Sequence, residues 1–392
     1  MQEVYIVSAV RTPIGSFGGS LAAFSATELG TKAIKGALQK SAIPVEVIDE
    51  VFMGNVISAG LGQAPARQAA LGAGIGNNVP CTTINKVCAS GMKAVMLGAQ
   101  SIMLGLNDIV VTGGMESMSN VPFYIPKARF GYKYGNGVLI DGLQHDGLWE
   151  PYHGFPMGSC ADNTAQVMGI TRQEQDDYAI TSYKRSTSAT ENGLFSNEII
   201  PVEIPQRKGG SILMTEDEEF RNVAFDKIPS LRPVFNKDGT VTAANASTIN
   251  DGAACVILVS QKKMDELGIK PIAKIRGFSD AAQEPLWFTT TPSLAIPKAM
   301  KLASIEKSDI DAYEINEAFS VVALANMKEL ALEHDKVNIL GGAVSLGHPL
   351  GASGARIIAT LNSALDHCRG SIGVAGICNG GGGASAIVIE KI

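Results

Sequence analysis

A short sequence recurs in the two halves of the chain, each time in the same context. Ala89-Ser90-Gly91 returns as Ala352-Ser353-Gly354, and each copy begins a segment with helical character. Each predicted helix is followed by a strand-like run, 109–113 in the first half and 372–376 in the second. The repetition predicts two similar α/β halves that face each other. A chance match of three small residues is the alternative.

Strand-like and helix-like segments alternate over most of the chain. Val4–Val10 has the pattern of a buried strand and Thr27–Lys40 that of a helix, which is typical of an α/β protein with a largely buried mixed sheet. The stretch from about Ser119 to Thr248 interrupts this alternation and is rich in Gly, Pro, Tyr and charged residues. We interpret it as a large insertion, with a helix near Thr171–Thr190, that carries ligand or oligomer contacts. A surface elaboration without function is the alternative.

The composition excludes several classes of protein. A net charge of −6 argues against a general nucleic-acid binder. No apolar stretch is long enough to span a bilayer, and neither a signal peptide nor an Arg-rich transit segment is recognisable. Six scattered cysteines without a CxxC pair predict reduced thiols. We therefore expect a cytoplasmic enzyme, and a processed mitochondrial chain is the alternative.

Cys88 stands between a short strand-like run and a helix-like segment, and small residues follow it directly. At such a turn the amides at the start of the helix lower the pKa of a thiol and point at a developing anion. Small neighbours also allow a substrate to approach closely. A lone cysteine is more often a small buried hydrophobe, so the turn alone leaves both interpretations open.

Three further segments carry groups that can act with Cys88. His348 lies in a glycine-lined loop, and histidine is the natural base for a thiol near neutral pH. Four glycines follow Cys378 after one asparagine, so backbone amides can reach a ligand oxygen while the thiol serves as an acid or base. Asn316 follows a strand-like run, where its amide can hold a water or donate to a carbonyl.

Together these four segments resemble the thiolase family in order and spacing, as do 11–15, 62–68 and 113–119. The resemblance covers essentially the whole chain. It implies an α/β fold of duplicated halves, with mixed five-stranded sheets in a layered α/β/α/β/α core and a large loop-domain insertion. Residues 1–118 and 249–270 would form the N-terminal half, 119–248 the loop domain, and 271–392 the C-terminal half. The implied assembly is a homotetramer, a dimer of dimers, with neither nucleic-acid nor membrane partners.

The resemblance also implies a chemistry, the reversible ping-pong condensation of two acetyl-CoA molecules to acetoacetyl-CoA and CoA. His348 would deprotonate Cys88, which would accept an acetyl group. Cys378 would then remove a proton from the second acetyl-CoA. One oxyanion hole would consist of His348 and a water held by Asn316, and the other of the backbone amides of Cys88 and Gly380.

Ligand contacts are implied for a wider set of residues. The family's coenzyme A contacts match Tyr183, Asn222, Val223, Ala224, Lys227 and Ser247. The potassium site of some members matches Tyr183, Ala243, Ala244, Ala246 and Val344. No tightly bound cofactor is implied, since coenzyme A thioesters are the substrates. The match at Asn222–Ala224 is looser, and a solvated surface lysine is the alternative for Lys227.

Two positions depart from the family pattern, Pro156 where many relatives carry histidine and Leu340 where many carry asparagine. Neither removes a catalytic group. The alternatives are a degradative 3-ketoacyl-CoA thiolase of broader chain length, a ketoacyl synthase, and a non-catalytic acyl-CoA-binding relative. Cys378 in place of a second histidine disfavours the synthase, and Met157 and Phe319 near a small pocket favour a short acyl group.

Overall fold

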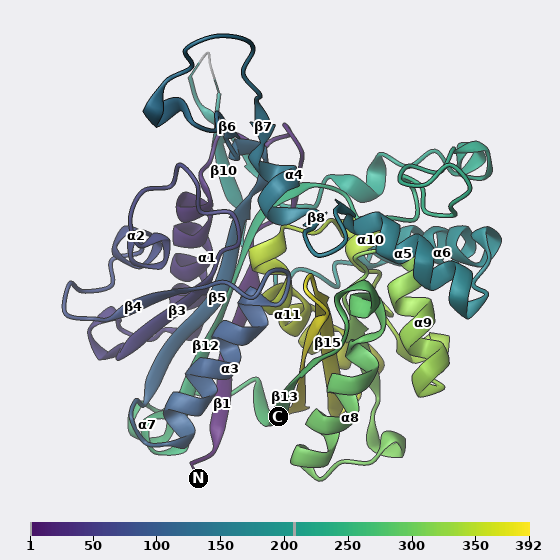
Figure 1. Ribbon diagram of the computed structural model, residues 1–392. Coiled ribbons are helices and arrows are strands. Elements are labelled where there is room, and N and C mark those ends of the chain that lie inside the picture. The colour runs from purple at the N-terminus through teal and green to yellow at the C-terminus, as the bar shows by residue number, and fades with distance from the viewer. Residues whose placement is uncertain (1, 207–208) are drawn as a thin grey trace.

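The computed structural model describes residues 2–206 and 209–392. Its main sheet is formed by β1 (Val4–Arg11), β2 (Gly15–Ser16), β3 (Glu50–Gly54), β4 (Cys81–Ile84), β5 (Ile109–Ser117), β12 (Asn250–Ser260), β13 (Ala273–Ala282), β14 (Ala312–Ile315), β15 (Ile372–Asn379) and β16 (Gly383–Lys391). These ten strands run in the order β14-β15-β16-β13-β1-β12-β5-β3-β4, with β2 paired to β12. Figure 1 shows the N-terminal half in purple and blue beside the C-terminal half in green and yellow.

The two halves of the sheet meet at β1 and β13, which pair only at Tyr5–Lys274 and Ile6–Ala273. The N-terminal half contributes five neighbouring strands in the order β1-β12-β5-β3-β4. The C-terminal half contributes four, in the order β13-β16-β15-β14. At the place of a fifth strand, beside β14, a single bridge joins Tyr313 to Val337. The pairing ends there because Asn338 has a φ of +49°, which turns the chain away. The predicted α/β fold is confirmed, and the second sheet is one strand shorter than the family resemblance implied.

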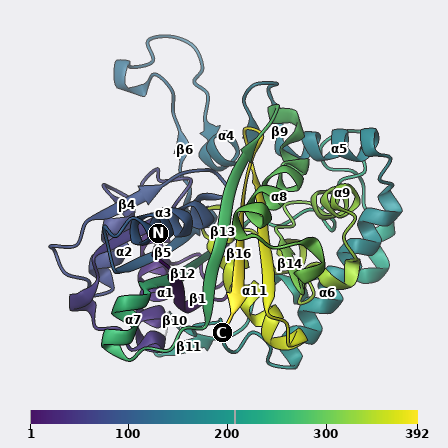
Figure 2. The same ribbon diagram turned by 90° about the horizontal axis from the view of Figure 1, so that it is seen from below.

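The helices of the two halves are α1 (Ala26–Ser41), α2 (Pro65–Gly72), α3 (Ser90–Met103), α7 (Gln261–Leu267), α8 (Pro292–Ala303), α9 (Ser320–Leu330), α10 (Ala343–Leu346) and α11 (Leu350–Cys368). Helices α1 and α2 cover the outer face of the first half, while α8, flanked by α9, covers that of the second. Between the halves α3 and α11 pack against each other and against strands of both. Seen from below, the long strand β13 lies between the purple and blue N-terminal half and the yellow strands of the C-terminal half (Figure 2). Apolar side chains of α3 and α11 form one buried core with those of the strands. This is the layered arrangement that the family resemblance implied.

The recurring glycines lie where α3 and α11 touch. A Cβ atom on Gly91 would lie 2.8 Å from the backbone nitrogen of Ala355, and one on Gly354 would lie 2.4 Å from that of Met92. Only glycine allows two backbones to approach so closely. The repeated triplet therefore reflects one reciprocal contact between the two central helices, which argues against a chance match.

Gly354→Ala is expected to lower the free energy of unfolding by about 1–3 kcal/mol, because the added methyl group overpacks a core contact between two backbones. Gly72→Ala at the end of α2 is the matched control, since the three atoms nearest to its methyl group all belong to the side chain of Thr31 and none to a backbone. Urea-unfolding midpoints at one protein concentration measure both. A midpoint for Gly354→Ala at or above that of the wild type would contradict the close helix contact.

The segment between β5 and β12 contributes no strand to the main sheet among residues 2–206 and 209–392. It contains β6 (Phe123–Tyr124), β7 (Ile140–Asp141), α4 (Gly142–Gly147), β8 (Trp149–Glu150), β9 (Phe155–Pro156), α5 (Met157–Met168), α6 (Arg172–Glu191), β10 (Val202–Pro205) and β11 (Ser211–Met214), and its strands pair as three small sheets. The predicted helix near 171–190 is confirmed as α6, which begins at a capping box of Thr171 and Glu174. The β6–β7 projection stands out at the top of Figure 1. No helix in the part of the chain described is long and apolar enough to cross a membrane.

Candidate active site

Cys88 lies in a tight, strained turn between β4 and α3. Val87 has a φ of +48°, a left-handed conformation that a β-branched residue rarely adopts. Asn85 Oδ1 accepts the Val87 N–H at 2.9 Å, and Ser90 Oγ donates to the Val87 carbonyl at 2.6 Å while it accepts from the Lys86 N–H at 2.8 Å. These bonds hold the strained turn, and such strain is retained at functional sites. They fix Cys88 directly before the first turn of α3.

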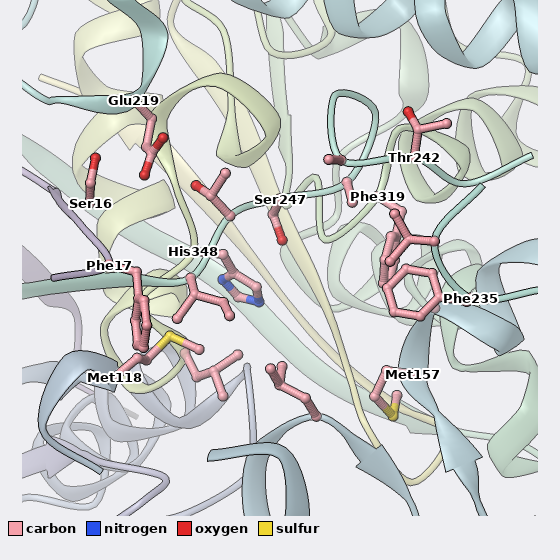
Figure 3. A pocket seen from close by; sticks show the side chains of 18 of the residues that line it. Ser16, Phe17, Met118, Met157, Glu219, Phe235, Thr242, Ser247, Phe319 and His348 are labelled. Carbon is pink, nitrogen blue, oxygen red and sulfur yellow. The ribbon is translucent and has the colours of Figure 1, made fainter. Parts of the chain in front are cut away.

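Cys88 opens on a small inner cavity of about 50 Å³, which His348 and Gly380 also line. A larger cleft of about 590 Å³ lies outside it. The cavity and the cleft share Leu148, Met157, Ser247, Phe319, His348 and Leu350, so one leads into the other. In Figure 3 the imidazole of His348 lies in the middle of the cleft below Ser247, with Phe17 on one side and the edge-to-face pair of Phe235 and Phe319 on the other. A narrow inner cavity thus lies at the end of a mostly apolar cleft.

The hydrogen bonds of His348 define which of its nitrogens carries the proton. Nδ1 lies 2.6 Å from Ser353 Oγ, and this hydroxyl donates to the Pro349 carbonyl at 2.9 Å. Because the hydroxyl has one proton, Nδ1 must be the donor to Ser353. Nε2 therefore keeps its lone pair and lies 3.5 Å from Asn316 Nδ2. Sequence reasoning missed Ser353, although it belongs to the recurring triplet.

The burial of the site controls its charge. Burial, together with the positive charge of Arg356, lowers the pKa of His348 to about 3, so the free imidazole is neutral at neutral pH. Burial raises the pKa of Cys88 to about 12, although the N–H groups of Gly380 and of Cys88 itself oppose this by hydrogen bonding to the sulfur. The expected lowering of the thiol pKa at the helix start was wrong, because desolvation outweighs the amides. A neutral thiol and a neutral imidazole face the cavity, and the N–H groups of Cys88 and Gly380 both lie at the sulfur.

Cys378 is the second thiol of the site. It lies near the end of β15 and is fully buried. Burial raises its pKa well above the ordinary value, and the charge of an ionised Cys88 raises it further. The two thiols therefore interact electrostatically and resist simultaneous ionisation. In the turn that follows, glycine is required at Gly382, where a Cβ atom would lie 2.2 Å from the Gln283 carbonyl oxygen.

A buried carboxylate connects the insertion to the His348 loop. Glu317 accepts hydrogen bonds from Tyr178 at 2.8 Å, Ser182 at 2.8 Å, Asn338 at 2.9 Å and the Val344 N–H at 3.0 Å. Helix α6 is thereby fastened to the segment that leads into His348. The sequence contained this residue within the segment 316–319, but it gave no sign of these partners because they are distant along the chain.

The predicted ligand-contact residues lie in three different settings. Asn222, Ala243, Ala246 and Ser247 line the outer cleft. Tyr183 and Val344 are buried in a small cluster with Phe220, against which Val223 packs, and Ala244 is buried as well. Ala224 and Lys227 are exposed, beside and within a 3-10 turn at 225–230. The structure thus brings part of the set to the cleft, while Lys227 does not line it.

The two departures from the family pattern do not enter the inner cavity. Pro156 pairs with Trp149 and precedes the first turn of α5. Leu340 is buried in the central core behind the His348 loop, so the expected effect of this position is on packing. Within residues 2–206 and 209–392, no group of three or more His, Cys, Asp and Glu side chains could hold a metal ion.

Duplicated α/β halves around a buried cysteine and a neutral histidine define the class, an acyltransferase enzyme. Residues 4–262 match the thiolase N-terminal domain, and residues 269–391 match the thiolase C-terminal domain. The chain therefore belongs to the thiolase family.

Relatives and solved structures agree with this assignment over full length. An acetyl-CoA acetyltransferase of Schizosaccharomyces pombe is 60% identical over 391 residues, which is 100% of this chain and 99% of that protein. A thiolase of Ascaris suum in complex with coenzyme A is 48% identical, with all of both chains covered and a TM-score of 0.94. The Bacillus anthracis acetyl-CoA acetyltransferase is 38% identical, with coverage of 100% and 99% and a TM-score of 0.97. Other relatives include forms named cytosolic and mitochondrial.

Proposed function

We propose that the protein is an acetyl-CoA C-acetyltransferase, which interconverts two acetyl-CoA molecules with acetoacetyl-CoA and CoA. The observation that carries the proposal is the inner cavity of about 50 Å³ between Cys88 and His348. A cavity needs about 10–15 Å³ of such volume to hold one water, so this one has room for a group of a few heavy atoms, such as an acetyl group. The names of the full-length relatives and the coenzyme A complex of a neighbour support the same substrate class.

In the first half-reaction His348 Nε2 takes the proton of Cys88 as the sulfur attacks the thioester carbonyl of acetyl-CoA. The negative oxygen of the adduct accepts hydrogen bonds from the N–H groups of Cys88 and Gly380, whose place at the sulfur supports this role. The carbon–sulfur bond to CoA then breaks, and CoA leaves with the proton of Cys378. Acetyl-Cys88, an imidazolium at His348 and a thiolate at Cys378 remain.

In the second half-reaction the Cys378 thiolate removes a proton from the methyl group of another acetyl-CoA. Acetyl-Cys88 carries no charge, so it does not raise the pKa of Cys378 as an ionised Cys88 would. His348 and a water held by Asn316 donate hydrogen bonds to the enolate oxygen. The enolate carbon attacks acetyl-Cys88, the Cys88 sulfur leaves, and His348 returns its proton to that sulfur. Every group then has its starting proton.

Coenzyme A would occupy the outer cleft, with Asn222 and Ser247 along it and Lys227 beyond its rim near the phosphates. The potassium ion would take oxygen atoms of Tyr183, Ala243, Ala244, Ala246 and Val344. Burial, with Glu219 and Glu317 nearby, raises the pKa of Tyr183, so this region has the negative potential that a cation favours. The ion's contribution would be to order the wall of the cleft.

The family resemblance also suggests how the protein assembles. We expect a homotetramer, a dimer of dimers, in which the β6–β7 projection takes part, and its exposed apolar side chains support a contact role. They include Phe123, Ile125, Phe130, Tyr134, Val138 and Leu139. Six free cysteines fit a reducing compartment, and we propose the cytoplasm. The boundaries 1–118 with 249–270, 119–248 and 271–392 remain the proposed domain division.

Thiolysis of acetoacetyl-CoA is expected to exceed that of a sixteen-carbon 3-ketoacyl-CoA by about 100-fold or more in kcat/KM, because the long chain does not fit the inner cavity. A separate comparison of thiolysis rates in potassium chloride and in sodium chloride, at equal ionic strength, tests the proposed potassium site. Phe288→Ala removes part of the cavity wall and should reduce the discrimination between the two substrates. Leu286 lines a different surface hollow, so Leu286→Ala should leave the discrimination unchanged. Equal rates for both substrates would favour the degradative thiolase instead.

A further inference from the structure

Arg356 is a buried cation with few partners. It lies in α11 between the two halves and is 1% exposed. Its Nη2 donates to Asn316 Oδ1 at 3.2 Å, and its Nη1 is 3.7 Å from Glu314 Oε2. Nε and Nη1 have no hydrogen-bond partner among the described residues. Burying a guanidinium with one hydrogen bond is unfavourable, so its place in the core needs an explanation other than stability.

The second fully buried arginine shows what a structural guanidinium looks like in this protein. Arg11 is also 1% exposed, but its Nε donates to Glu198 at 2.6 Å, and Nη1 and Nη2 donate to Asp217 at 2.6 and 2.9 Å. These bonds join β1 to the insertion. Arg356 has no such carboxylate fork, and its one hydrogen bond goes to the residue that faces His348.

That hydrogen bond determines how the amide of Asn316 points. With Oδ1 turned to Arg356, Nδ2 faces His348 Nε2 at 3.5 Å. A flipped amide would place Oδ1 against the lone pair of Nε2, and two acceptors repel each other. In the flipped state the amide could also no longer donate to the bound water, which would use one of its two protons on Oδ1.

We propose that Arg356 is a positioning residue of the condensation step, which fixes the amide of Asn316 so that Nδ2 faces His348 and the bound water. The inference deepens the proposed function and rests on it. Asn316 is the group that meets the water, and Arg356 acts through it. Glu314 Oε2 lies 3.7 Å from Nη1 and makes no hydrogen bond to Asn316, so the role belongs to the arginine.

The kinetic test compares Arg356→Met, Arg356→Lys and Glu314→Gln, with Arg11→Lys as the control for a structural arginine. Arg356→Met should lower kcat for condensation by about 10- to 100-fold, less than the roughly 10²–10³-fold of a lost oxyanion donor because Asn316 is kept, with little change in KM. Acetylation of Cys88 by acetyl-CoA, followed by mass spectrometry, should stay within a few-fold of the wild type. Glu314→Gln should keep kcat within about threefold, because it leaves the bond to Asn316.

A pH profile separates the effect of the Arg356 charge on His348 from the effect of its hydrogen bond to Asn316. The titratable groups around the His348 ring are Arg356, the Cys88 thiol, Glu116 through the Gly351 N–H, and Glu219 through Asn250. Loss of the positive charge in Arg356→Met removes a repulsion, so the pKa of His348 rises and the acid limb of Cys88 acetylation moves to higher pH. Arg356→Lys keeps the charge and should keep the acid limb, while its single ammonium holds Asn316 less well and lowers kcat.

Equal losses of kcat and of the urea midpoint in Arg356→Met and Glu314→Gln would overturn the proposal, since they would describe a structural ion pair. Unchanged kcat in Arg356→Lys together with an unchanged acid limb in Arg356→Met would overturn it too. If Arg356→Met does not fold, Arg356→Lys provides the test. A reduced kcat of condensation at an unchanged urea midpoint supports positioning, and an unchanged kcat contradicts it. Wild-type protein that never acetylates Cys88 would instead refute the proposed function itself.

Discussion

Cys88→Ala is expected to lower the rate of acetoacetyl-CoA thiolysis by about 10⁴-fold or more, because the variant has no group to carry the acetyl intermediate. The sulfur lies at the end of the inner cavity, with His348 and the Gly380 amide around it. Removing it leaves the bracing of the turn by Asn85 and Ser90 in place, so the fold should survive. Initial rates and mass spectrometry after exposure to acetyl-CoA measure the loss of turnover and of the acetyl adduct.

A second buried cysteine provides the matched control. Cys255 is fully buried in β12 and lines neither the inner cavity nor the outer cleft, so Cys255→Ala should keep both activity and the acetyl adduct. The Cys88→Ala protein should still bind CoA, because the cleft is unchanged. Appreciable CoA-dependent thiolysis by Cys88→Ala would refute the assignment of the nucleophile.

The parts of the fold that follow from local sequence were predictable. The start of helix α6 is encoded locally by its capping box, Thr171 with Glu174. The repeated triplet lies in the first turns of α3 and α11. The number of strands in each half was not predictable in this way. The bridge at Val337 and the two-pair joint of β1 with β13 depend on how distant elements meet, and no local pattern encodes them.

The candidate site shows the same division. The sequence supplied the cysteines, the histidine and the asparagine that the structure gathers around one cavity or directly behind it. It did not reveal Ser353 as the partner of Nδ1 or Arg356 as the partner of Asn316, because both roles arise from three-dimensional contacts. It also misjudged the pKa of Cys88, since the degree of burial cannot be read from a turn.

Cys378→Ala is expected to separate the two half-reactions. Acetylation of Cys88 should still reach completion, at a reduced rate, because CoA can leave as a thiolate without the proton of Cys378. Condensation should fall by about 10²–10⁴-fold, the usual contribution of a positioned acid or base, because no group remains to remove the methyl proton. Mass spectrometry of the trapped acetyl-enzyme and steady-state rates of acetoacetyl-CoA formation measure the two effects separately.

The reason for this separation is electrostatic. Ionised Cys88 raises the pKa of Cys378, and acetylation keeps Cys88 uncharged while CoA leaves with the proton of Cys378, so the second thiol becomes a base in the acetyl-enzyme. In deuterated solvent the wild-type enzyme should therefore exchange methyl protons of acetyl-CoA, and Cys378→Ala should not. Cys160→Ala removes another fully buried thiol, one that lines neither the cavity nor the cleft, and should behave as the wild type. An unmodified Cys88 in the Cys378→Ala protein would show that both thiols are needed for acetyl transfer, and the division of labour between them would be wrong.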